Sequence, residues 1–420
     1  MTGVRLTGNT FLGGTFTGTP PRDIGYAVRT QQPLTGSDLF LLQNTFSNVD
    51  SAIQIVGDAA SPPGNVRVVD NTMSVLSQGM SLSDVKAPLV VRNRIDARTD
   101  AIQIVRARGA AAIRQNHIFT RWDGIDVSTS DGTAGAEIVN NTVSIFPSPT
   151  RNGYGIRLAG SPGWRILHNS ATVLGAILDG RGFTLHLVDS PGADVQNNAL
   201  GATGRAIPYT VNGASAPIVS GHNALEAGTG AIGIVAGTPY ATLSAFVAAL
   251  DAYDPDGTEG TGTIAAALGF ANARQGDLHT TAAALQSAGV DVGVGVDLDG
   301  DPRPSPAGSA PDIGADETGA ASVAAAASAA AVPAEFALGQ PFPNPAPGSA
   351  RVPYAVPEAG PVTVDVWDLL GRRVAVLADG VTEAGTHEAV VSAGSLAAGT
   401  YVVRMRAGAF SATAQLTLVR

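Results

Sequence analysis

An asparagine recurs at a nearly constant interval through the first half of this 420-residue chain, each time inside an alternating apolar run. The runs include VRVVDNTMSV, AEIVNNTVSI and WRILHNSATV. The shared asparagines are Asn9, Asn44, Asn71, Asn93, Asn116, Asn141, Asn169, Asn198 and Asn223. From the second of these onward, the spacings are 27, 22, 23, 25, 28, 29 and 25 residues. Self-similarity with a period of about 20–50 residues is typical of solenoids, so a repeat architecture is the first expectation.

A second pattern lies between the asparagines: a small residue followed by apolar, polar and apolar residues, as in AIQIV, GMSLS, GIDVS and GIRLA. Alternation with period two predicts strands that bury one face. Asparagine tolerates the left-handed backbone of a sharp corner, and stacked asparagines can bond to one another in a ladder. We therefore predict an all-β fold whose main part, residues 1–235, is a right-handed parallel β-helix.

Two alternatives fit the repeat less well. Leucine-rich repeats need the consensus L-x-x-L-x-L, which is missing, and an immunoglobulin-like array needs antiparallel hairpins and no fixed asparagine. The first run, VRLTGNTF, already resembles a strand from the middle of an array, and the N-terminal residues lack the apolar core of a signal peptide. We expect that further N-terminal coils and an export signal are missing from this chain.

Composition excludes several classes of function. A net charge of −10 disfavours nucleic-acid binding, which needs a basic face. The absence of cysteine excludes disulfides, a thiol nucleophile and a thiolate zinc site. The longest weakly polar run, 320–332, is shorter than the roughly 20 residues that span a bilayer. We expect a monomer without a transmembrane segment.

The asparagine pattern stops after Leu225, and residues 236–317 are expected to form an irregular cap. Thr242 is placed to N-cap a short amphipathic helix ending at Leu250, suited to covering the open end of the coil. Acidic loops follow, the second of which is VDLDGDPRPSPAGSAPDIGADE. This segment resembles the closing segment of many bacterial secreted β-helix proteins, which runs D-x-D-G-x-x-R and then D-I-G-A-x-E.

Residues 318–335 form an Ala-rich, low-complexity linker. Beyond it, residues 336–420 contain short alternating strands with frequent turn residues, which predict a small, immunoglobulin-like β-sandwich. The side chains expected to face inward are those of Val362, Val364 and Val366. Those expected to face outward are Thr363, Asp365 and Trp367.

Four motifs of this last unit resemble the C-terminal sorting domain of type IX secretion substrates. They are PNP at 343–345, VWDLLGRRV at 366–374, GTH at 385–387 and LAAGTY at 396–401. The resemblance implies export across the outer membrane of a Bacteroidota-type cell, with the type IX machinery as partner, and then release or surface anchoring. A secreted or cell-surface location is therefore expected. An unrelated β-sandwich binding module is the alternative.

Candidate site residues lie on the outward side of the apolar–polar–apolar strands. Neighbouring rungs of a β-helix lie about 4.8 Å apart, so outward side chains on successive rungs form a column. The predicted column is Gln54, Ser81, Gln103, Asp126, Arg157 and His186. From three of these positions, together with Asp123 just before its own strand, we predict a catalytic patch of Asp123, Asp126, Arg157 and His186, because carboxylates with arginine and histidine suit proton abstraction beside a uronate or glycosidic hydrolysis. The predicted ligand-binding residues are Asp100, Gln103, Trp122 and Tyr154, with Trp164 as a further stacking face.

The same residues also fit a structural role, because Asp–Arg pairs across rungs are ordinary surface electrostatics. The chain lacks the N-T-D, D-D and G-H-G motifs of polygalacturonases and the W-I-D-H of pectate lyases. We therefore expect a secreted protein that binds polysaccharide or another extracellular glycan. Polysaccharide lyase or glycoside hydrolase activity on the same face is the alternative.

A structural calcium site is a further expectation. Asp297, Asp299 and Asp301 place oxygen ligands at alternate positions around a turn glycine, as at the start of a calcium loop. No glutamate follows at the twelfth position to complete an EF-hand, so a solvated Asp/Gly turn is the other interpretation.

Overall fold

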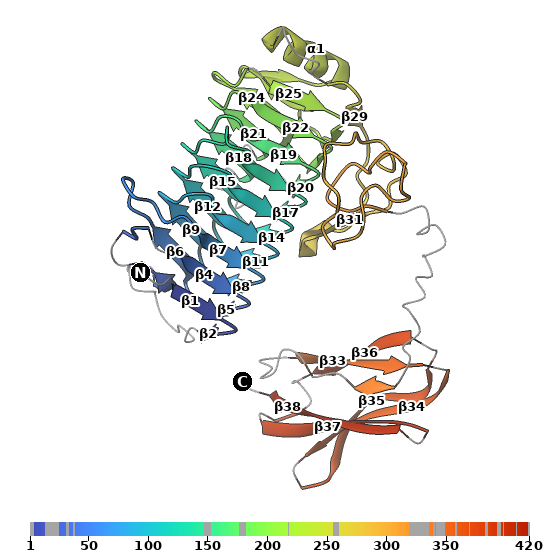
Figure 1. Ribbon diagram of the computed structural model, residues 1–420. Helices are drawn as coiled ribbons and strands as arrows, with labels where there is room; N and C mark the ends of the chain where they lie inside the picture. The colour runs from blue at the N-terminus through green and yellow to red at the C-terminus, as the bar shows by residue number, and fades with distance from the viewer. Residues whose placement is uncertain are drawn as a thin grey trace. The chain divides into compact units, whose positions relative to one another are not determined.

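The computed structural model divides the chain into two units, Met1–Ala320 and Ala321–Arg420 (Figure 1). In the first, the described residues are 4–12, 25–30, 33–36, 38–146, 153–175, 182–216, 218–254 and 260–318. In the second, they are 336–338, 341, 349–357, 359–368, 370–382, 385–392, 396–397, 399–408 and 410–418. Most of the predicted linker, the PNP motif at 343–345, and the loops 147–152 and 176–181 lie outside these residues.

The first unit is built from three sheets whose strands alternate along the chain. Sheet 1 contains β1 (Val4–Thr7), β4 (Leu39–Leu42), β7 (Val66–Val69), β10 (Leu89–Val91), β13 (Ala112–Arg114), β16 (Glu137–Val139), β19 (Arg165–Leu167), β22 (Ala193–Gln196) and β25 (Ile218–Gly221). Sheet 2 contains β2 (Thr10–Leu12), β5 (Thr45–Ser47), β8 (Thr72–Val75), β11 (Arg94–Ala97), β14 (His117–Thr120), β17 (Thr142–Ile145), β20 (Ser170–Val173), β23 (Ala199–Ala202), β26 (Ala224–Glu226) and β29 (Ile264–Ala265). Sheet 3 contains β3 (Tyr26–Arg29), β6 (Ser51–Val56), β9 (Met80–Ser83), β12 (Ile102–Val105), β15 (Ile125–Ser128), β18 (Tyr154–Ala159), β21 (Phe183–Val188), β24 (Ile207–Asn212), β27 (Gly233–Val235) and β28 (Thr238–Tyr240).

Each strand pairs in parallel with the equivalent strand of the next coil, apart from the antiparallel end pair β27–β28. The apolar positions of one rung therefore stack on those of the next. Ile104, Val127, Leu158 and Leu187 form one such column, and none of them is exposed to solvent. This arrangement confirms the predicted parallel β-helix, since each coil buries its apolar face only against its neighbours.

The nine repeated asparagines form one continuous ladder, as predicted. The side-chain Nδ2 of each donates to Oδ1 of the next over 2.9–3.0 Å. The same Oδ1 also accepts the backbone N–H of the preceding asparagine. From Asn44 to Asn223 every ladder residue is at most 1% exposed. The ladder therefore provides hydrogen-bond partners for buried backbone groups at the corners, where strand pairing provides none.

The left-handed corner residue, however, is not the ladder asparagine, and that part of the prediction was wrong. The positive φ angle belongs to the residue immediately before each asparagine. These residues are Gly8, Gln43, Asp70, Arg92, Gln115, Asn140, His168, Asn197 and His222, with φ between 50° and 67°. The bend at this residue leaves the asparagine side chain pointing inward along the axis, where it can bond to the next rung.

A second ladder follows sheet 3 and was not predicted. Its members are Ser130, Ser161, Ser190 and Ser215. The hydroxyls of Ser161, Ser190 and Ser215 each accept the backbone N–H of the serine one rung earlier over 3.1–3.2 Å, and that of Ser130 accepts the N–H of Ala107. Ser161 and Ser190 are both followed by Pro-Gly, whereas Ser130 and Ser215 are not, so only the stacking of the coils reveals the whole repeat.

The helix α1 (Leu243–Tyr253) covers the end of the solenoid beyond β24 and β27 (Figure 1). The Thr242 side chain accepts the N–H of Ala245, which confirms Thr242 as the predicted N-cap. Phe246 and Leu250 are buried in the solenoid core, and the Phe246 ring meets Tyr209 edge-on at 5.5 Å. The helix thus closes the apolar end of the last coil. None of the described helical segments combines the length and apolar character needed to cross a bilayer.

The rest of the cap lies along the side of the solenoid, not over its end. It contains β30 (Phe270–Asn272), the short helix η1 (Ala273–Gln275) and β31 (Asp277–Thr280), followed by irregular chain. Four left-handed corner side chains bond to backbone carbonyls of residues 288–297. The pairs are His222 with Ala288, Asn197 with Val290, Asn140 with Val296, and Gln115 with Asp297. The left-handed corner residues therefore hold this part of the cap against the side of the solenoid.

In the second unit, β32 (Ala337–Leu338), β33 (Ser349–Val356) and β36 (Gly385–Ser392) form one sheet. The other sheet contains β35 (Arg373–Thr382), β34 (Gly360–Asp368), β37 (Gly399–Ala407) and β38 (Phe410–Leu418). Val362, Val364 and Val366 are buried in the core that the two sheets share, as predicted. The predicted outward position Asp365 is only 1% exposed, because Arg373 and Arg404 lie 3.6 Å from its carboxylate.

Candidate functional site

The outward side chains of sheet 3 form a column along the solenoid. Strand register aligns Arg29, Gln54, Ser81, Gln103, Asp126, Arg157, His186 and Thr210 on successive rungs. The structure thus places the six predicted positions in one line and extends that line at both ends. We call these eight residues the outer column.

An ion pair occupies the centre of the candidate patch. The Arg157 Nη1 donates to Oδ1 of Asp126 over 3.0 Å, and their side chains are 29% and 9% exposed. The Arg157 guanidinium also lies 5.3 Å from the centre of the Tyr154 ring, in a cation–π contact. Burial raises the pKa of Asp126, and Arg157 opposes that shift. The pair leaves part of the guanidinium accessible to a ligand from solution.

Aromatic rings form a wall on one side of this pair. Tyr154 stacks on Phe183 at 5.5 Å and on His186 at 5.3 Å. Phe183, Ile207 and other apolar side chains form a small cluster separate from the solenoid core. Both rings that stack on Tyr154 come from β21, the next strand of the sheet. Burial, together with Arg157, lowers the pKa of His186 to about 4, so this ring is neutral at physiological pH.

Three buried polar atoms beside the wall have no hydrogen-bond partner in the described part of the chain. They are Arg157 Nε, His186 Nδ1 and Thr210 Oγ1, all on neighbouring rungs. An unsatisfied buried polar atom costs on the order of 1–3 kcal/mol. Each of these atoms has hydrogen-bonding capacity that no described protein group uses, so this end of the outer column is a candidate ligand site.

Asp123 lies two residues before β15, beside Tyr154 on the next rung. Its Oδ1 accepts the backbone N–H of Tyr154 over 3.1 Å. Burial raises the pKa of Asp123 to about 7, and the negative charges of Asp100 and Asp126 add to the shift. The site therefore holds one carboxyl group that binds a proton near neutral pH next to an arginine-paired carboxylate.

Replacing Asp123 with asparagine should stabilise the protein at alkaline pH. The carboxyl pKa is raised on folding, so its contribution to stability is full below about pH 4 and is lost as pH rises through about 7. Asparagine keeps the acceptor for Tyr154 N–H and carries no charge. We expect a higher Tm than wild type at pH 8 and little difference at pH 4, measured by circular dichroism. The exposed Asp251→Asn is the control; an equal Tm difference at both pH values would contradict this assignment.

The remaining predicted ligand-binding residues differ in their accessibility. Gln103 accepts a hydrogen bond from Ser81 Oγ over 3.0 Å and lies in the outer column. Asp100 and Trp122 are half-buried, and they lie two residues before β12 and three residues before β15 respectively. Trp164 is fully buried, and its Nε1 donates to the Ser130 carbonyl over 3.0 Å. The expectation that Trp164 offers a stacking face is therefore wrong, because its indole fills the core beneath the serine ladder.

The three aspartates of the predicted calcium loop do not point to a common centre. Oδ1 of Asp297 accepts the backbone N–H groups of Asp299, Gly300 and Asp301, and its Oδ2 accepts that of Glu317. Both oxygens thus organise the turn itself. Calcium at this loop stays a prediction, and the Asp299 side chain is turned toward another group.

That group is His279 on β31. Its Nε2 lies 2.9 Å from Asp299 and its Nδ1 lies 2.6 Å from Asp277. Hydrogen bonds to these carboxylates, the one to Asp299 first, raise the pKa of His279 to about 10. Together with Asp316, His279 and Asp299 offer ligand atoms within 4.8 Å of one another. A protonated imidazole among these carboxylates offsets one of their negative charges.

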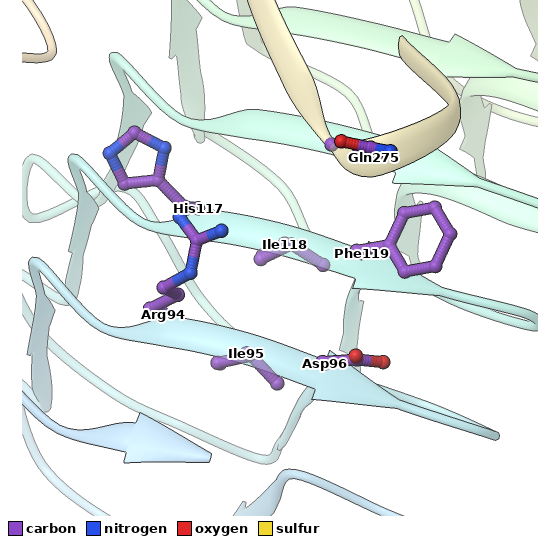
Figure 2. A pocket seen from close by; sticks show the side chains of 8 residues that line it. Arg94, Ile95, Asp96, His117, Ile118, Phe119 and Gln275 are labelled. Carbon is purple, nitrogen blue, oxygen red and sulfur yellow. The ribbon is translucent and has the colours of Figure 1, made fainter. Parts of the chain in front are cut away.

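A shallow pocket of about 100 Å³ separates the cap from the outer face of sheet 2 (Figure 2). Figure 2 shows the His117 and Arg94 side chains side by side at one end and the Phe119 ring at the other, with Gln275 of the cap above. Pockets that bind organic ligands usually measure about 300–1,000 Å³, so this one suits a few water molecules. The outer column of sheet 3 is therefore the better candidate site.

Sequence analysis did not predict several residues that belong to the site or to the outer column. Phe183 and Thr210 belong to coils whose strands match the repeat, but their roles depend on the neighbours that stack against them. Tyr26 and Arg29 repeat the Tyr-x-x-Arg spacing of Tyr154 and Arg157, and that repetition was the available signal.

Two family models match the chain. Residues 34–206 match the model described as periplasmic copper-binding protein (NosD), and residues 340–418 match the model described as a secretion system C-terminal sorting domain. No curated protein and no solved structure matches the chain. The first match lies within the solenoid and includes the Arg157 end of the outer column. The second covers nearly all of the C-terminal β-sandwich.

Proposed function

We propose that this secreted or cell-surface β-helix protein, whose C-terminal unit is a type IX secretion sorting domain, binds an extracellular polysaccharide on the outer column of sheet 3. The observation that carries the proposal is the group at Arg157. There a partly exposed guanidinium, an aromatic wall and three unsatisfied polar atoms lie together on an otherwise regular strand face. Ligand sites typically combine apolar walls with a few placed polar groups in this way.

The chemistry of the group suits sugars. Hydroxyl groups donate to carboxylate and amide oxygens and accept from guanidinium N–H groups, and both kinds are present at Asp126, Gln103 and Arg157. Export to the cell surface places this face where polysaccharides are available. The sorting domain implies contact with the secretion machinery, which is a separate partner from the ligand of the solenoid.

Replacing Arg157 with alanine should weaken polysaccharide binding by about tenfold or more, since it removes the accessible donor at the centre of the group. Binding is measured by affinity electrophoresis of the full chain in gels containing laminarin, xyloglucan, galactomannan, alginate or polygalacturonate. Arg67→Ala is the matched control, because Arg67 is exposed on β7 of sheet 1. Equal retardation of wild type and Arg157→Ala in every gel, with both proteins folded, would refute the proposal.

Catalysis on the same face is the second candidate. Asp123, with its pKa near 7, is suited to act as a general acid beside the arginine-paired Asp126. The same polysaccharides, incubated with the protein and assayed for reducing ends and for absorbance of unsaturated products, distinguish hydrolysis, elimination and binding without turnover.

Copper, named in the description of the first matched family, is not proposed for this chain. Within residues 34–206, His117 contacts the Thr142 hydroxyl, His168 is buried against Arg303 and His186 is packed in the aromatic wall. In the described part of the chain, the one group of three clustered histidine and acidic ligands is at His279, Asp299 and Asp316, outside the matched segment.

A further inference from the structure

The outer column contains a second tyrosine–arginine pair near its N-terminal end. Tyr26 and Arg29 on β3 repeat the spacing of Tyr154 and Arg157 on β18. The Arg29 guanidinium lies 6.0 Å from the centre of the Tyr26 ring, as Arg157 lies over Tyr154. Strand register places both arginines in the same column. The arrangement at Arg157 therefore occurs twice on one face.

The two pairs are five rungs apart. In sheet 3 the strand order between them is β3, β6, β9, β12, β15 and β18. At about 4.8 Å per rung the separation is roughly 24 Å, a length that a chain of about five sugar rings spans. Figure 1 shows β6, β9, β12, β15 and β18 in an uninterrupted series along one side of the solenoid. A ligand that contacts both pairs must lie along the solenoid axis, across the strands.

Amide and carboxylate groups fill the strip between the pairs. Tyr26 donates its hydroxyl proton to Gln78 Oε1 over 3.1 Å, which ties the first pair to this strip. Further along, Gln103 lies in register with Asp126. Asp100 and Asp123 precede their strands on the same two rungs. These oxygens accept hydrogen bonds from hydroxyl groups, whereas their negative charges repel a polyanion.

Unsatisfied buried polar atoms gather at both ends of this strip. At the Arg157 end they are the three atoms described above, and at the other end they are Asp50 Oδ2 and Gln54 Oε1. Gln54 is the rung neighbour of Arg29, and Asp50 directly precedes the Ser51 that pairs with Tyr26. Of the atoms of this kind in the described solenoid strands and corners, only Asn140 Oδ1 lies elsewhere. The second pair thus shares with the first pair a neighbouring group of buried polar atoms that no described protein group satisfies.

We infer that one neutral polysaccharide chain lies along the solenoid axis and contacts both tyrosine–arginine pairs, with its hydroxyl groups bonded to the amide and carboxylate strip between them. This inference rests on the proposed function and extends it from one site to an elongated one. It assigns the ligand class as neutral, because only the two ends of the strip carry arginine. A polyuronate would place its carboxylates beside Asp100 and Asp126.

The test compares oligosaccharides of graded length, prepared from the polysaccharide that most retards the wild-type protein. Calorimetry on the full chain should show affinity rising up to about five or six sugar units and then levelling off. Arg29→Ala should weaken binding of the long oligosaccharides about tenfold and leave that of di- and trisaccharides unchanged. Arg29 is exposed, so its truncation should not affect folding, and Tyr26→Phe provides a second variant of the same end. Arg157→Ala should weaken binding at every length.

Each alternative result separates the extended site from the proposed function. If Arg29→Ala matches wild type at every length while Arg157→Ala binds weakly, the extended site is wrong and the Arg157 site stands. Tighter binding of alginate or polygalacturonate than of any neutral polysaccharide overturns the neutral class. If no polysaccharide retards the wild-type protein, the proposed function falls and this inference falls with it.

Discussion

Replacing Arg303 with alanine is expected to lower the free energy of unfolding of the cap by about 3–5 kcal/mol, because it leaves a buried carboxylate without its counter-charge. Arg303 and Glu317 are 3.1 Å apart, and their side chains are 1% and 0% exposed. The guanidinium also donates to the carbonyls of Asp312, Gly314 and Ala315. Glu317 in turn accepts the backbone N–H groups of Ser305 and Asp312.

This network gives a physical reason for the D-x-D-G-x-x-R and D-I-G-A-x-E pattern. Asp297 organises the first turn, and Arg303 and Glu317 fasten the two segments to each other. His168 on the solenoid corner contacts Arg303 Nη1, and burial together with that positive charge lowers its pKa well below the usual value. The pattern therefore attaches the cap to the solenoid through charged groups that are fully withdrawn from water.

The loss should be measured by hydrogen exchange of cap amides such as those of Ile313 and Gly314, because the solenoid and the cap need not unfold together. The exposed Arg121→Ala is the matched control. In the double variant Arg303→Met, Glu317→Gln the unpaired charge is gone, so the loss should be smaller than in Arg303→Ala. Protection of the cap amides at the wild-type level in Arg303→Ala would show that the ion pair contributes little.

Replacing Asn141 with alanine, in the middle of the ladder, should lower the free energy of unfolding of the solenoid by a comparable amount, about 3–5 kcal/mol. Asn141 Oδ1 accepts both the backbone and the side-chain N–H of Asn116. Its Nδ2 donates to the Ile113 and Val139 carbonyls and to Asn169 Oδ1. Alanine leaves several of these buried groups unpaired at once, in a place that water does not reach.

The measurement is urea unfolding followed by circular dichroism and by tryptophan fluorescence, to which the buried Trp164 contributes. The control is Asn65→Ala, since Asn65 is exposed and its amide bonds only to Asp38 in the described surroundings. It should change stability by less than about 0.5 kcal/mol. Similar losses in the two variants would mean that the ladder organises the corner without stabilising it.

Features that repeat along the chain were predictable because each coil imposes the same local requirement. The alternating strands, the single asparagine column and the outward positions from Gln54 to His186 follow from period two together with a fixed corner residue. The capping role of Thr242 and the inward valines of the C-terminal unit are equally local.

Other features depend on which segments come into contact in the folded chain, and local sequence patterns contain no information about those contacts. The left-handed residue precedes the asparagine because the side chain must point along the axis to reach the next rung. Residues 288–297 lie along the left-handed corner residues and not over the open end of the solenoid. Their backbone carbonyls accept hydrogen bonds from the corner side chains. Because every residue has a backbone carbonyl, the sequence contains no sign of this position.

For this protein, the amino-acid sequence by itself determined the parallel β-helix, its asparagine ladder and the column in which Asp126, Arg157 and His186 lie. Only the tertiary structure decided which side chains remain accessible there. It buried Trp164 beneath the serine ladder, packed Tyr154 against Phe183 and raised the pKa of Asp123 to about 7. The physical reason is that strand periodicity is a property of one coil, whereas burial, stacking and charge are set by neighbouring coils, which lie 22–29 residues away in sequence.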